Sequence, residues 1–275
     1  MIQIAVLLTV HNRREKTLQC LQHLLAQEMD NSIKLSVYLT DDGCTDDTAS
    51  SAKKLLPEIT IINGDGNLYW NRGMRAAWEA ATNDKDYDFY LWLNDDTMLL
   101  PTAISHLLQC AKKKGNEAII SGCISSTMPP YKTTYCGRTR NTWITCNGTL
   151  QRLRLMHGNT VLIPQSVYHK IGKNDCYYRH AFGDYDYALT AASKGIATYS
   201  SEKFVGRCDI DNKHPKCFDK RYTLHQRFTN LYSPTSYFYP TDAFHFDMKH
   251  NGVFIALGRY IYLHLSCLFP CMWRD

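Results

Sequence analysis

Three short polar side chains, Asn94, Asp95 and Asp96, directly follow a run of large apolar residues, Phe89 to Leu93. A buried strand that ends in this way delivers carboxylates to the carboxyl edge of its sheet. Carboxylate oxygens are preferred ligands of hard divalent cations, which often share them with substrate phosphates. Because Asn and Asp are also ordinary turn residues, the cluster indicates a cation site only if other polar loops lie beside it.

The elements that would position these carboxylates alternate along the chain. Apolar runs rich in β-branched residues predict strands, and an apolar period of 3.6 residues predicts the helices between them. The predicted strands are residues 2–10, 35–39, 59–62, 89–93, 118–121 and 159–164, and the predicted helices are 15–28, 48–56, 70–81 and 101–114. This alternation is typical of an α/β fold with a mostly parallel central sheet and helices on both faces. Polar loops follow the first four strands and should gather at one edge of the sheet, where ligands bind.

The composition is that of an ordinary globular protein. Of 275 residues, 44% are hydrophobic and 21% are charged, which suffices for a sizeable core. The net charge of +5 is too small to indicate nucleic-acid binding and is compatible with anionic substrates or an acidic membrane surface. The first residues show no signal peptide, and none of the eleven cysteines has C-x-x-C spacing. Both observations predict reduced thiols and a cytoplasmic location.

Six segments, in this order, resemble the motifs of the family-2 inverting glycosyltransferases with the GT-A fold, especially bacterial enzymes that assemble surface polysaccharides. They are TVHNR (Thr9–Arg13), DDGCTDDT (Asp41–Thr48), GNLYWNRG (Gly66–Gly73), LNDDT (Leu93–Thr97), GNTVLIP (Gly158–Pro164) and FGDYDYALTAASKG (Phe182–Gly195). Each motif is weak alone, but their joint order over about two-thirds of the chain is specific. A dinucleotide-binding oxidoreductase is less favoured, because Tyr69 stands where the fingerprint that begins at Gly64 needs its third glycine.

The resemblance implies a nucleotide-sugar site formed by the loops after the first three strands. Carboxylates accept strongly from imide and hydroxyl donors, and an arginine can meet phosphate. Either Asp41 or Asp42 would accept from the base or ribose, and the residues alone leave this choice open. Asp46 and Asp47 are predicted to cap the following helix instead. The residues implied near the nucleotide-sugar are Thr9, Asn12, Arg13, Asp41, Asp42, Asn71, Arg72 and Asp95.

The cation motif of the family is usually D-x-D, and Asn94 occupies its first acidic position. The resemblance therefore implies Asp96 as the chief ligand of Mn²⁺ or Mg²⁺, with Asp95 reaching the ribose or a metal-bound water. His214 is a further candidate ligand. A cation bridging the phosphates would stabilise the charge that the nucleoside diphosphate gains as the glycosidic bond breaks.

An inverting transfer also needs a base for the proton of the acceptor hydroxyl. The resemblance assigns this role to Asp184, beside which Gly183 replaces a frequent Glu. Asp186 would be structural or would orient the acceptor, and both acids are also suited to capping a helix at residues 187–194. His180 is predicted as a packed or capping residue rather than an acceptor contact.

The C-terminal quarter begins with a basic stretch and ends in an apolar one. Residues 202–227 hold seven Lys/Arg against four Asp/Glu and are predicted as a flap over the donor phosphates or as a solvated surface. Residues 252–273 are mostly apolar, but Arg259 and His264 interrupt them, so a membrane span is not predicted. Three partners stay open for this helix. It could lie in the membrane interface at the inner face of the cell membrane, pack on the rest of the domain, or pack on a second subunit in a homodimer.

Together these observations predict a metal-dependent, inverting glycosyltransferase that moves a hexose or deoxyhexose from a nucleoside-diphosphate-sugar to a hydroxyl of a glycan or lipid-linked acceptor. Residues 1–125 would be the nucleotide-sugar-binding half of a GT-A domain and residues 126–205 its acceptor-binding half. Residues 206–275 would form a basic flap and an amphipathic helical extension. The alternative is a catalytically idle nucleotide-sugar-binding or scaffold protein of a polysaccharide assembly complex, which the replacements Asn94 and Gly183 keep open.

Overall fold

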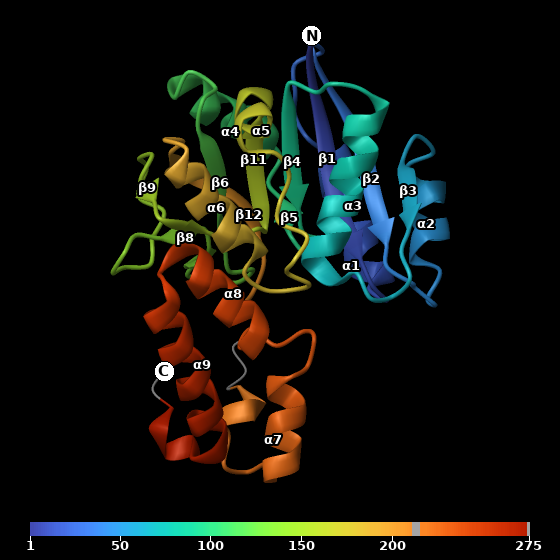
Figure 1. Ribbon diagram of the computed structural model, residues 1–275. Coiled ribbons are helices and arrows are strands. Elements are labelled where there is room, and N and C mark those ends of the chain that lie inside the picture. Colours follow the sequence, from blue (N-terminus) through green and yellow to red (C-terminus); the bar gives the residue numbers. More distant parts are fainter. Residues whose placement is uncertain (211–214, 274–275) are drawn as a thin grey trace.

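The computed structural model describes residues 1–210 and 215–273, and it is built around a ten-stranded mixed sheet (Figure 1). In spatial order the strands of its main path are β3 (Thr60–Asn63), β2 (Ile33–Asp41), β1 (Ile2–Val10), β4 (Phe89–Leu93), β11 (Thr160–Pro164), β6 (Ile119–Ser125), β12 (Thr198–Arg207) and β5 (Met98–Leu99). β11 runs antiparallel to β4 and β6, and β5 runs antiparallel to β12. The other neighbours along this path are parallel, so β1, β2, β3, β4, β6 and β12 end at the same edge.

Alternate side chains of β1 enter two separate apolar cores, because successive residues of a strand face opposite sides of the sheet. Ile4, Val6 and Leu8 pack on one side, and Ala5 and Leu7 pack on the other. Burial of both faces explains why this strand is a continuous apolar run. The predicted α/β fold is confirmed. The first core is covered by α1 (Arg14–Leu25), α2 (Thr48–Leu55) and α4 (Ala103–Lys113), and the second by α3 (Tyr69–Asp84), α5 (Gln165–Ile171) and α6 (Gly183–Ser193).

The order of the strands reverses beside β1. The chain places β1, β2 and β3 outward in sequence, and α3 then returns it to β4 on the other side of β1. Ligands of open α/β sheets bind at such a switch point, outside the carboxyl ends of the strands. The loops after β1 and β4, which hold Arg13 and residues 94–96, therefore adjoin each other.

The segment between β6 and β11, residues 126–159, forms short strands and is called the insert below. β7 (Thr133–Tyr135) pairs with β6, and β9 (Arg152–Leu153) pairs with β12. β8 (Gly137–Arg138) and β10 (Leu155–Met156) form a separate two-stranded sheet. The β7–β6 and β9–β12 pairings attach the insert to the half of the main sheet that contains β6 and β12.

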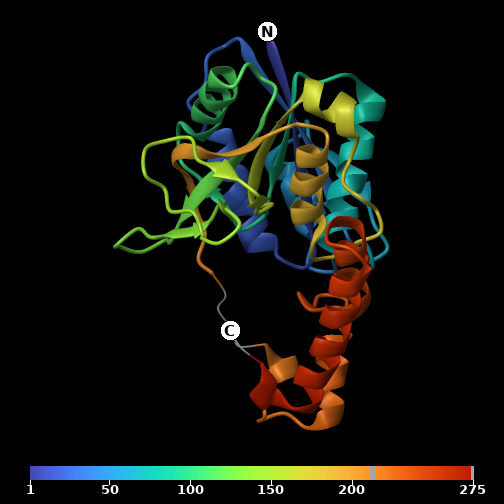
Figure 2. The ribbon, with the colours of Figure 1, turned by 60° about the vertical axis from the view of Figure 1, so that its left-hand side comes forward.

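A helical extension follows β12 and projects from the carboxyl edge of the sheet, with α8 nearest to it (Figures 1 and 2). Its elements are η1 (Lys216–Phe218), α7 (Leu224–Leu231), α8 (Pro240–His250), α9 (Val253–Leu268) and η2 (Pro270–Met272). Their buried residues, with Tyr178 and Phe182 of the main domain, form a third apolar core. Residues 202–207 of the predicted flap are instead part of β12. Among the described helices, none has the length and apolarity needed to cross a bilayer.

Candidate active site

A guanidinium and two carboxylates meet where the loops after β1 and β4 adjoin. Arg13 Nη1 lies 3.0 Å from Asp95 Oδ1, and Arg13 Nη2 donates to Asp96 Oδ2 at 2.7 Å. Thr17 of α1 donates to the other oxygen of Asp95 at 3.4 Å. Two carboxylates facing one guanidinium leave an excess of negative charge, which attracts a cation.

Asp95 is the buried member of the pair. The residue is 4% exposed, and burial raises the pKa of its carboxyl to about 7, although Arg13 acts in the opposite direction. Arg13 and Thr17 occupy its two oxygens. In this arrangement Asp95 holds Arg13 in place, and each of its oxygens already has a protein partner.

Asp96 keeps a free acceptor. Its Oδ1 is buried and has no hydrogen-bond partner within the described ranges, while Oδ2 is bonded to Arg13. A buried carboxylate oxygen without a partner is costly unless a donor or a cation completes it. The oxygen fits a hard divalent cation whose other ligands come from water or phosphate. His214, the other predicted ligand, lies outside the described residues.

Trp70 links this pair to the other half of the site. Its Nε1 donates to Asn94 Oδ1 at 2.7 Å, and its ring packs edge-on against Trp92, with 5.7 Å between centroids. The far end of the indole lies against Gly158, where an added Cβ would be 2.4 Å from Trp70 Cζ2. The Gly158 N–H donates to Asp184 Oδ2 at 2.9 Å. A continuous path of contacts therefore joins Asn94 to Asp184.

The same contact explains the amide at position 94. Asn94 gives Trp70 an acceptor without adding charge, whereas Asp at this position would place a third carboxylate beside Asp95 and Asp96. Arg13 is the cation bonded to those two acids. Because its amide oxygen accepts the hydrogen bond of the indole N–H, Asn94 supports the site by holding Trp70 in place.

Asp184 lies half-buried in the first turn of α6. Its Oδ2 accepts from Gly158 and its Oδ1 accepts from the Tyr185 N–H at 2.8 Å. Burial raises the pKa of Asp184 to about 6, against the lowering effect of these backbone bonds. A carboxylate with a pKa near the working pH, held by fixed donors, is suited to accept a proton.

The two acids after β2 have different environments. Asp42 is 3% exposed and accepts from the backbone N–H groups of Gly66 at 2.9 Å and Tyr69 at 2.8 Å. Asp41 is half-buried and uses Oδ1 for the Cys44 N–H at 2.7 Å. Asp42 therefore holds the loop after β3, and Asp41 is the more accessible carboxylate.

The start of α3 is tied to the loop that precedes α6. Asn71 is fully buried, and its Nδ2 donates to the carbonyls of Asp175 at 2.7 Å and Tyr178 at 2.8 Å. Arg72 donates to the carbonyls of residues 176 and 177 at 3.0 and 3.1 Å. These bonds give Asn71 and Arg72 a structural role, and the buried Asn71 offers no surface to a ligand.

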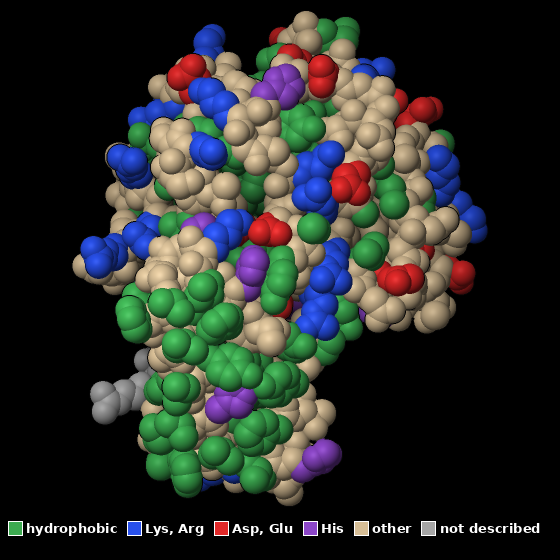
Figure 3. Space-filling model, in the orientation of Figure 1, with side chains coloured by type: hydrophobic (Ala, Val, Ile, Leu, Met, Phe, Trp, Pro, Cys, Tyr) green, Lys and Arg blue, Asp and Glu red, His purple; other side chains and the backbone are tan. Residues whose placement is uncertain are grey.

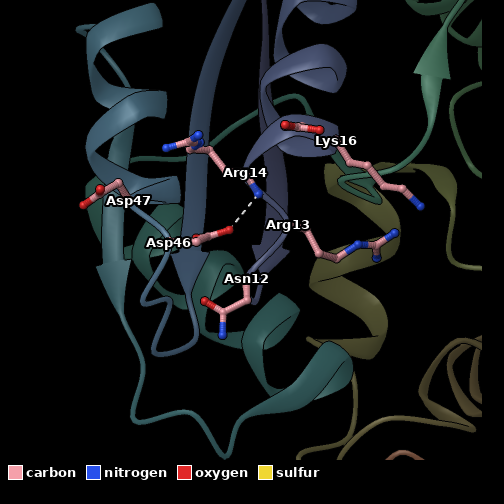
Figure 4. Close-up of a pocket in the computed structure, with 7 residues that line it drawn as sticks. Asn12, Arg13, Arg14, Lys16, Asp46 and Asp47 are labelled. Carbon is pink, nitrogen blue, oxygen red and sulfur yellow. Dashed lines mark hydrogen bonds between the residues drawn. The ribbon is translucent and has the colours of Figure 1, made fainter.

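A cavity of about 620 Å³ opens beside Asn12 and Arg13 (Figure 4). Figure 4 shows Arg13 and Lys16 on one side of it and Arg14, Asp46 and Asp47 on the other. Its volume lies in the range of small-molecule sites, roughly 300–1,000 Å³. Asp46 accepts from the Arg14 N–H at the start of α1 at 3.0 Å and from the Thr48 N–H at the start of α2 at 3.2 Å. Asp47 is the N-cap residue of α2, but its side chain makes no capping hydrogen bond, so of the two predicted capping acids only Asp46 bonds to the helix start.

Thr9 and Asn12 bring the loop after β1 against its neighbours. Thr9 packs under α3, where a Cβ on Gly73 would lie 2.1 Å from Thr9 Oγ1. Asn12 accepts from the Thr45 N–H at 2.7 Å, which joins the loops after β1 and β2. Only Asn12 of this pair lines the 620 Å³ cavity.

Asp186 joins α6 to the helical extension. It is 2% exposed, and its carboxylate accepts from Lys249 Nζ at 2.9 Å and lies 2.7 Å from His250 Nε2. Its role is therefore structural, which was one of the two predicted alternatives. His180 packs 5.7 Å from the ring of Tyr237, and burial lowers the pKa of His180, so it fits the predicted packing role.

Gly183 stands against the buried amide of α3. A Cβ at this position would lie 1.9 Å from Asn71 Oδ1, and Asn174 Nδ2 holds that oxygen at 2.7 Å. The preceding residue, Phe182, has φ 69°, so the chain turns sharply into α6. The close approach of α6 to α3 accounts for the absence of the Glu that the resemblance leads one to expect.

We expect Gly183→Ala to lower the free energy of unfolding by about 1–3 kcal/mol, the usual cost of forcing extra atoms into a packed site. Urea denaturation measures this change. Gly258→Ala in α9 is the matched control, because no atom lies within 4 Å of its added Cβ. That control should be neutral or stabilising, since Ala favours a helix more than Gly by up to about 1 kcal/mol. Wild-type stability of Gly183→Ala would contradict the packing described here.

Sequence reasoning missed three contributors to the site. Thr17 was not singled out, and Trp70 and Gly158 entered only as members of the GNLYWNRG and GNTVLIP motifs. The position of Trp70 at the start of a helix could have indicated this role, because a buried indole needs a hydrogen-bond partner for its N–H. Nothing local to the sequence identified Asn94 as that partner.

The fold and the site define an α/β protein whose carboxylates and arginine meet at the switch point of the sheet. The chain belongs to glycosyl transferase family 2, whose model matches residues 5–185. A curated relative, the uncharacterized glycosyltransferase RP339 of Rickettsia prowazekii (strain Madrid E), is 22% identical over 188 residues, which are 66% of this chain and 56% of the relative. The chain thus spans about half the length of that relative.

A solved structure has a similar fold. It is the mannosyltransferase PcManGT from Pyrobaculum calidifontis in complex with GDP-Man and Mn²⁺, with a TM-score of 0.57 and 14% sequence identity. The match covers 97% of this chain, including the helical extension, and 71% of that chain. It supports the GT-A type of the fold.

Proposed function

We propose that this protein is an inverting glycosyltransferase that moves a sugar from a nucleoside-diphosphate-sugar to an acceptor hydroxyl. The observation that carries this proposal is the contact path from Asn94 through Trp70 and Gly158 to Asp184. It holds an acid of raised pKa in a fixed relation to the carboxylates at the switch point. Family membership and the GDP-Man and Mn²⁺ bound by the similar mannosyltransferase support the proposal.

On the donor side, Arg13 and Asp96 would hold the diphosphate, and Asn12 and Asp41 would lie beside the nucleoside. Asp96 Oδ1 and phosphate oxygens would ligate Mn²⁺ or Mg²⁺, and such a cation, when bound, neutralises the charge that develops on the leaving diphosphate. Separate nitrogens of Arg13 serve the two carboxylates. The guanidinium can therefore turn one nitrogen to phosphate and keep its bond to Asp95.

On the acceptor side, Asp184 would take the proton of the attacking hydroxyl. The hydroxyl oxygen bonds to the anomeric carbon as the bond from that carbon to the diphosphate breaks, and the hydroxyl proton passes to the carboxylate. Attack opposite the diphosphate inverts the anomeric configuration. The N–H groups of Gly158 and Tyr185 fix the carboxylate for this role.

The two replacements that suggest an idle scaffold have packing explanations. Asn94 accepts from Trp70, and Gly183 makes room for Asn71. Neither replacement removes a group that the reaction needs. We therefore favour an enzyme over a scaffold, with residues 1–125 supplying the donor side and residues 126–205 the acceptor side.

Donor binding is the first test. A thermal-shift screen of UDP, GDP, dTDP and CDP sugars should give a rise in melting temperature that depends on Mn²⁺, because a ligand of the folded state stabilises it. The same donor should then be hydrolysed slowly to free sugar and nucleoside diphosphate. Binding without turnover on any acceptor would favour the scaffold, and no binding of any donor would contradict the proposal.

We also propose that the outer face of α9 contacts an anionic membrane surface. Phe254 and Ile255 are 87% and 55% exposed, and Figure 3 shows hydrophobic side chains gathered over this extension. From residue 215 to 273 the chain has six Lys/Arg and three Asp, and all three acids are buried. Arg221, Lys249 and Arg259 pair with acids, so Lys216, Lys220 and Arg227 give the extension its positive charge. An apolar helix face on a basic extension suits anionic lipid headgroups, whereas a second copy would bring like charges together. The buried acids are Asp219, Asp242 and Asp247.

Co-sedimentation with phosphatidylglycerol vesicles checks this contact. Wild-type protein should pellet with them, and Phe254→Ser/Ile255→Ser should remain in the supernatant with an unchanged melting temperature. Equal sedimentation of the two proteins would contradict a membrane role for this face. A dimer that the same variant dissociates would assign the face to a second subunit.

A further inference from the structure

A second cavity, of about 190 Å³, lies between the β8–β10 sheet and the helices α6 and α8. Three arginines of the insert line it: Arg138, Arg140 and Arg154. Leu189 of α6 and Phe246 of α8 give it an apolar wall. The volume is below the roughly 300 Å³ of sites for drug-sized ligands, so the cavity suits a compact group.

These guanidinium groups are not neutralised by the described part of the chain, where none of the three forms an ion pair with a carboxylate. Arg138 donates to the carbonyl of Arg140 at 3.1 Å. Asn251, which also lines the cavity, is bonded to Asp247, whose carboxylate pairs with Arg259 at 3.4 Å. Three positive charges that line one cavity, without a carboxylate partner in the described chain, attract an anion.

A row of rings connects the cavity to Asp184. The guanidinium of Arg138 lies over the ring of Trp143 at 5.2 Å. Trp143 stacks on His157, with 5.3 Å between centroids and 11° between planes. The hydroxyl of Tyr185, the residue after Asp184, is 3.3 Å from His157 Nε2. Ring contacts therefore connect the cavity to Tyr185, the residue that follows the acid assigned to the acceptor hydroxyl.

Clustered arginines recognise phosphate well, because each planar fork can donate two parallel hydrogen bonds to phosphate oxygens. Neutral sugar hydroxyls need no such charge, and the donor diphosphate is assigned to Arg13 and Asp96 at the switch point. We propose that Arg138, Arg140 and Arg154 bind a phosphate group of the acceptor, so that the enzyme acts on a phosphorylated acceptor. This inference rests on the proposed function.

Inorganic pyrophosphate, titrated by calorimetry in the presence of EDTA, tests the site without donor or cation. The wild type should bind it, and Arg138→Gln/Arg154→Gln should bind at least about tenfold more weakly, from the loss of charge-assisted hydrogen bonds. Arg152→Gln is the matched control, because Arg152 is exposed in the neighbouring β9 and does not line the cavity. Equal affinity of the double variant and the wild type would overturn the proposal. So would a loss of binding in Arg13→Gln with binding retained in the double variant.

Two further arms identify the source of the phosphate. Farnesyl diphosphate, a soluble phosphorylated amphiphile, should bind through the same arginines and lose affinity in the double variant. Phosphatidylglycerol vesicles should bind the wild type and the double variant equally. Loss of vesicle binding with pyrophosphate affinity unchanged would assign the arginines to lipid headgroups and overturn the acceptor site.

Donor binding separates this inference from the proposed function. Mn²⁺-dependent affinity for the donor should be the same in the double variant and the wild type, because the arginines lie outside the donor loops. If the wild type binds pyrophosphate through the arginines but binds no donor, the proposed function and the acceptor assignment both fail, and an anion site of another purpose remains. If donor binding is normal and pyrophosphate does not bind, the inference alone fails.

Discussion

Replacing Asp184 by Asn should lower kcat at least about 100-fold, because the amide cannot take the acceptor proton and general-base catalysis typically contributes 10²–10⁴-fold. The amide oxygen can still accept from the Gly158 N–H, so the local fold should persist. The Kd for the donor in the presence of Mn²⁺, measured by calorimetry, should stay at the wild-type value. A variant that keeps its melting temperature and its full transfer activity would remove Asp184 from the mechanism.

The raised pKa of Asp184 adds a test in the wild type. Because its pKa is about 6 in the free protein, the carboxylate is protonated below that pH and ionised above it. The base must be ionised, so kcat/KM should fall about tenfold for each pH unit below 6 and level off above it. Any residual activity of Asp184→Asn should lack this fall in kcat/KM below pH 6. A flat profile in the wild type between pH 5 and 7 would contradict the assignment.

Replacing Asp96 by Ala should weaken Mn²⁺-dependent donor binding about 100-fold or more, since a cation contributes several kcal/mol at a phosphate site and each 1.4 kcal/mol is tenfold. The variant removes the buried oxygen that has no partner in the described structure. Calorimetric titration of the donor, with Mn²⁺ and with EDTA, measures the effect. In EDTA the variant and the wild type should bind with similar, weak affinity.

Asp65→Ala is the matched control for the lost charge. Asp65 is exposed in the loop after β3, at the same edge of the sheet, and its carboxylate accepts from the Asn67 N–H at 2.9 Å. It should reduce neither the Mn²⁺ dependence nor the donor affinity by a large factor. Unchanged Mn²⁺-dependent affinity in Asp96→Ala would remove Asp96 from the cation site.

The edge of the sheet where the site forms was predictable because local patterns determine it. Apolar runs that stop at Val10, Leu39 and Leu93 mark buried strands, and parallel strands must deliver their loops to one edge. The contact of Arg13 with the acids after β4 follows from this order. Periodicity also fixed the helices of the first half, because each buries one continuous apolar stripe.

The parts that could not be predicted depend on contacts between distant residues. Asn71 has the sequence context of a ligand contact, yet it is committed to carbonyls more than 100 residues away. Asp42 and Asp41 are neighbours of the same type, and only the path of the loop after β3 distinguishes them. The extension was predicted to be helical and is so, but the bounds of α7 and α8 could not be predicted, because their stability comes from a third core that no single helix defines.

The bond between α6 and α8 has a consequence for exchanging parts of this protein with those of its relatives. Lys249 and His250 of α8 meet the buried carboxylate of Asp186, two residues after Asp184. Removing one partner of a fully buried ion pair costs about 3–5 kcal/mol. The cost is smaller for Lys249, whose side chain is 34% exposed, and greatest when both basic partners of Asp186 are lost. The C-terminal helices are therefore not an interchangeable module. A chimera that takes them from another enzyme must also take the partner of position 186, or the helix that carries the base loses its anchor.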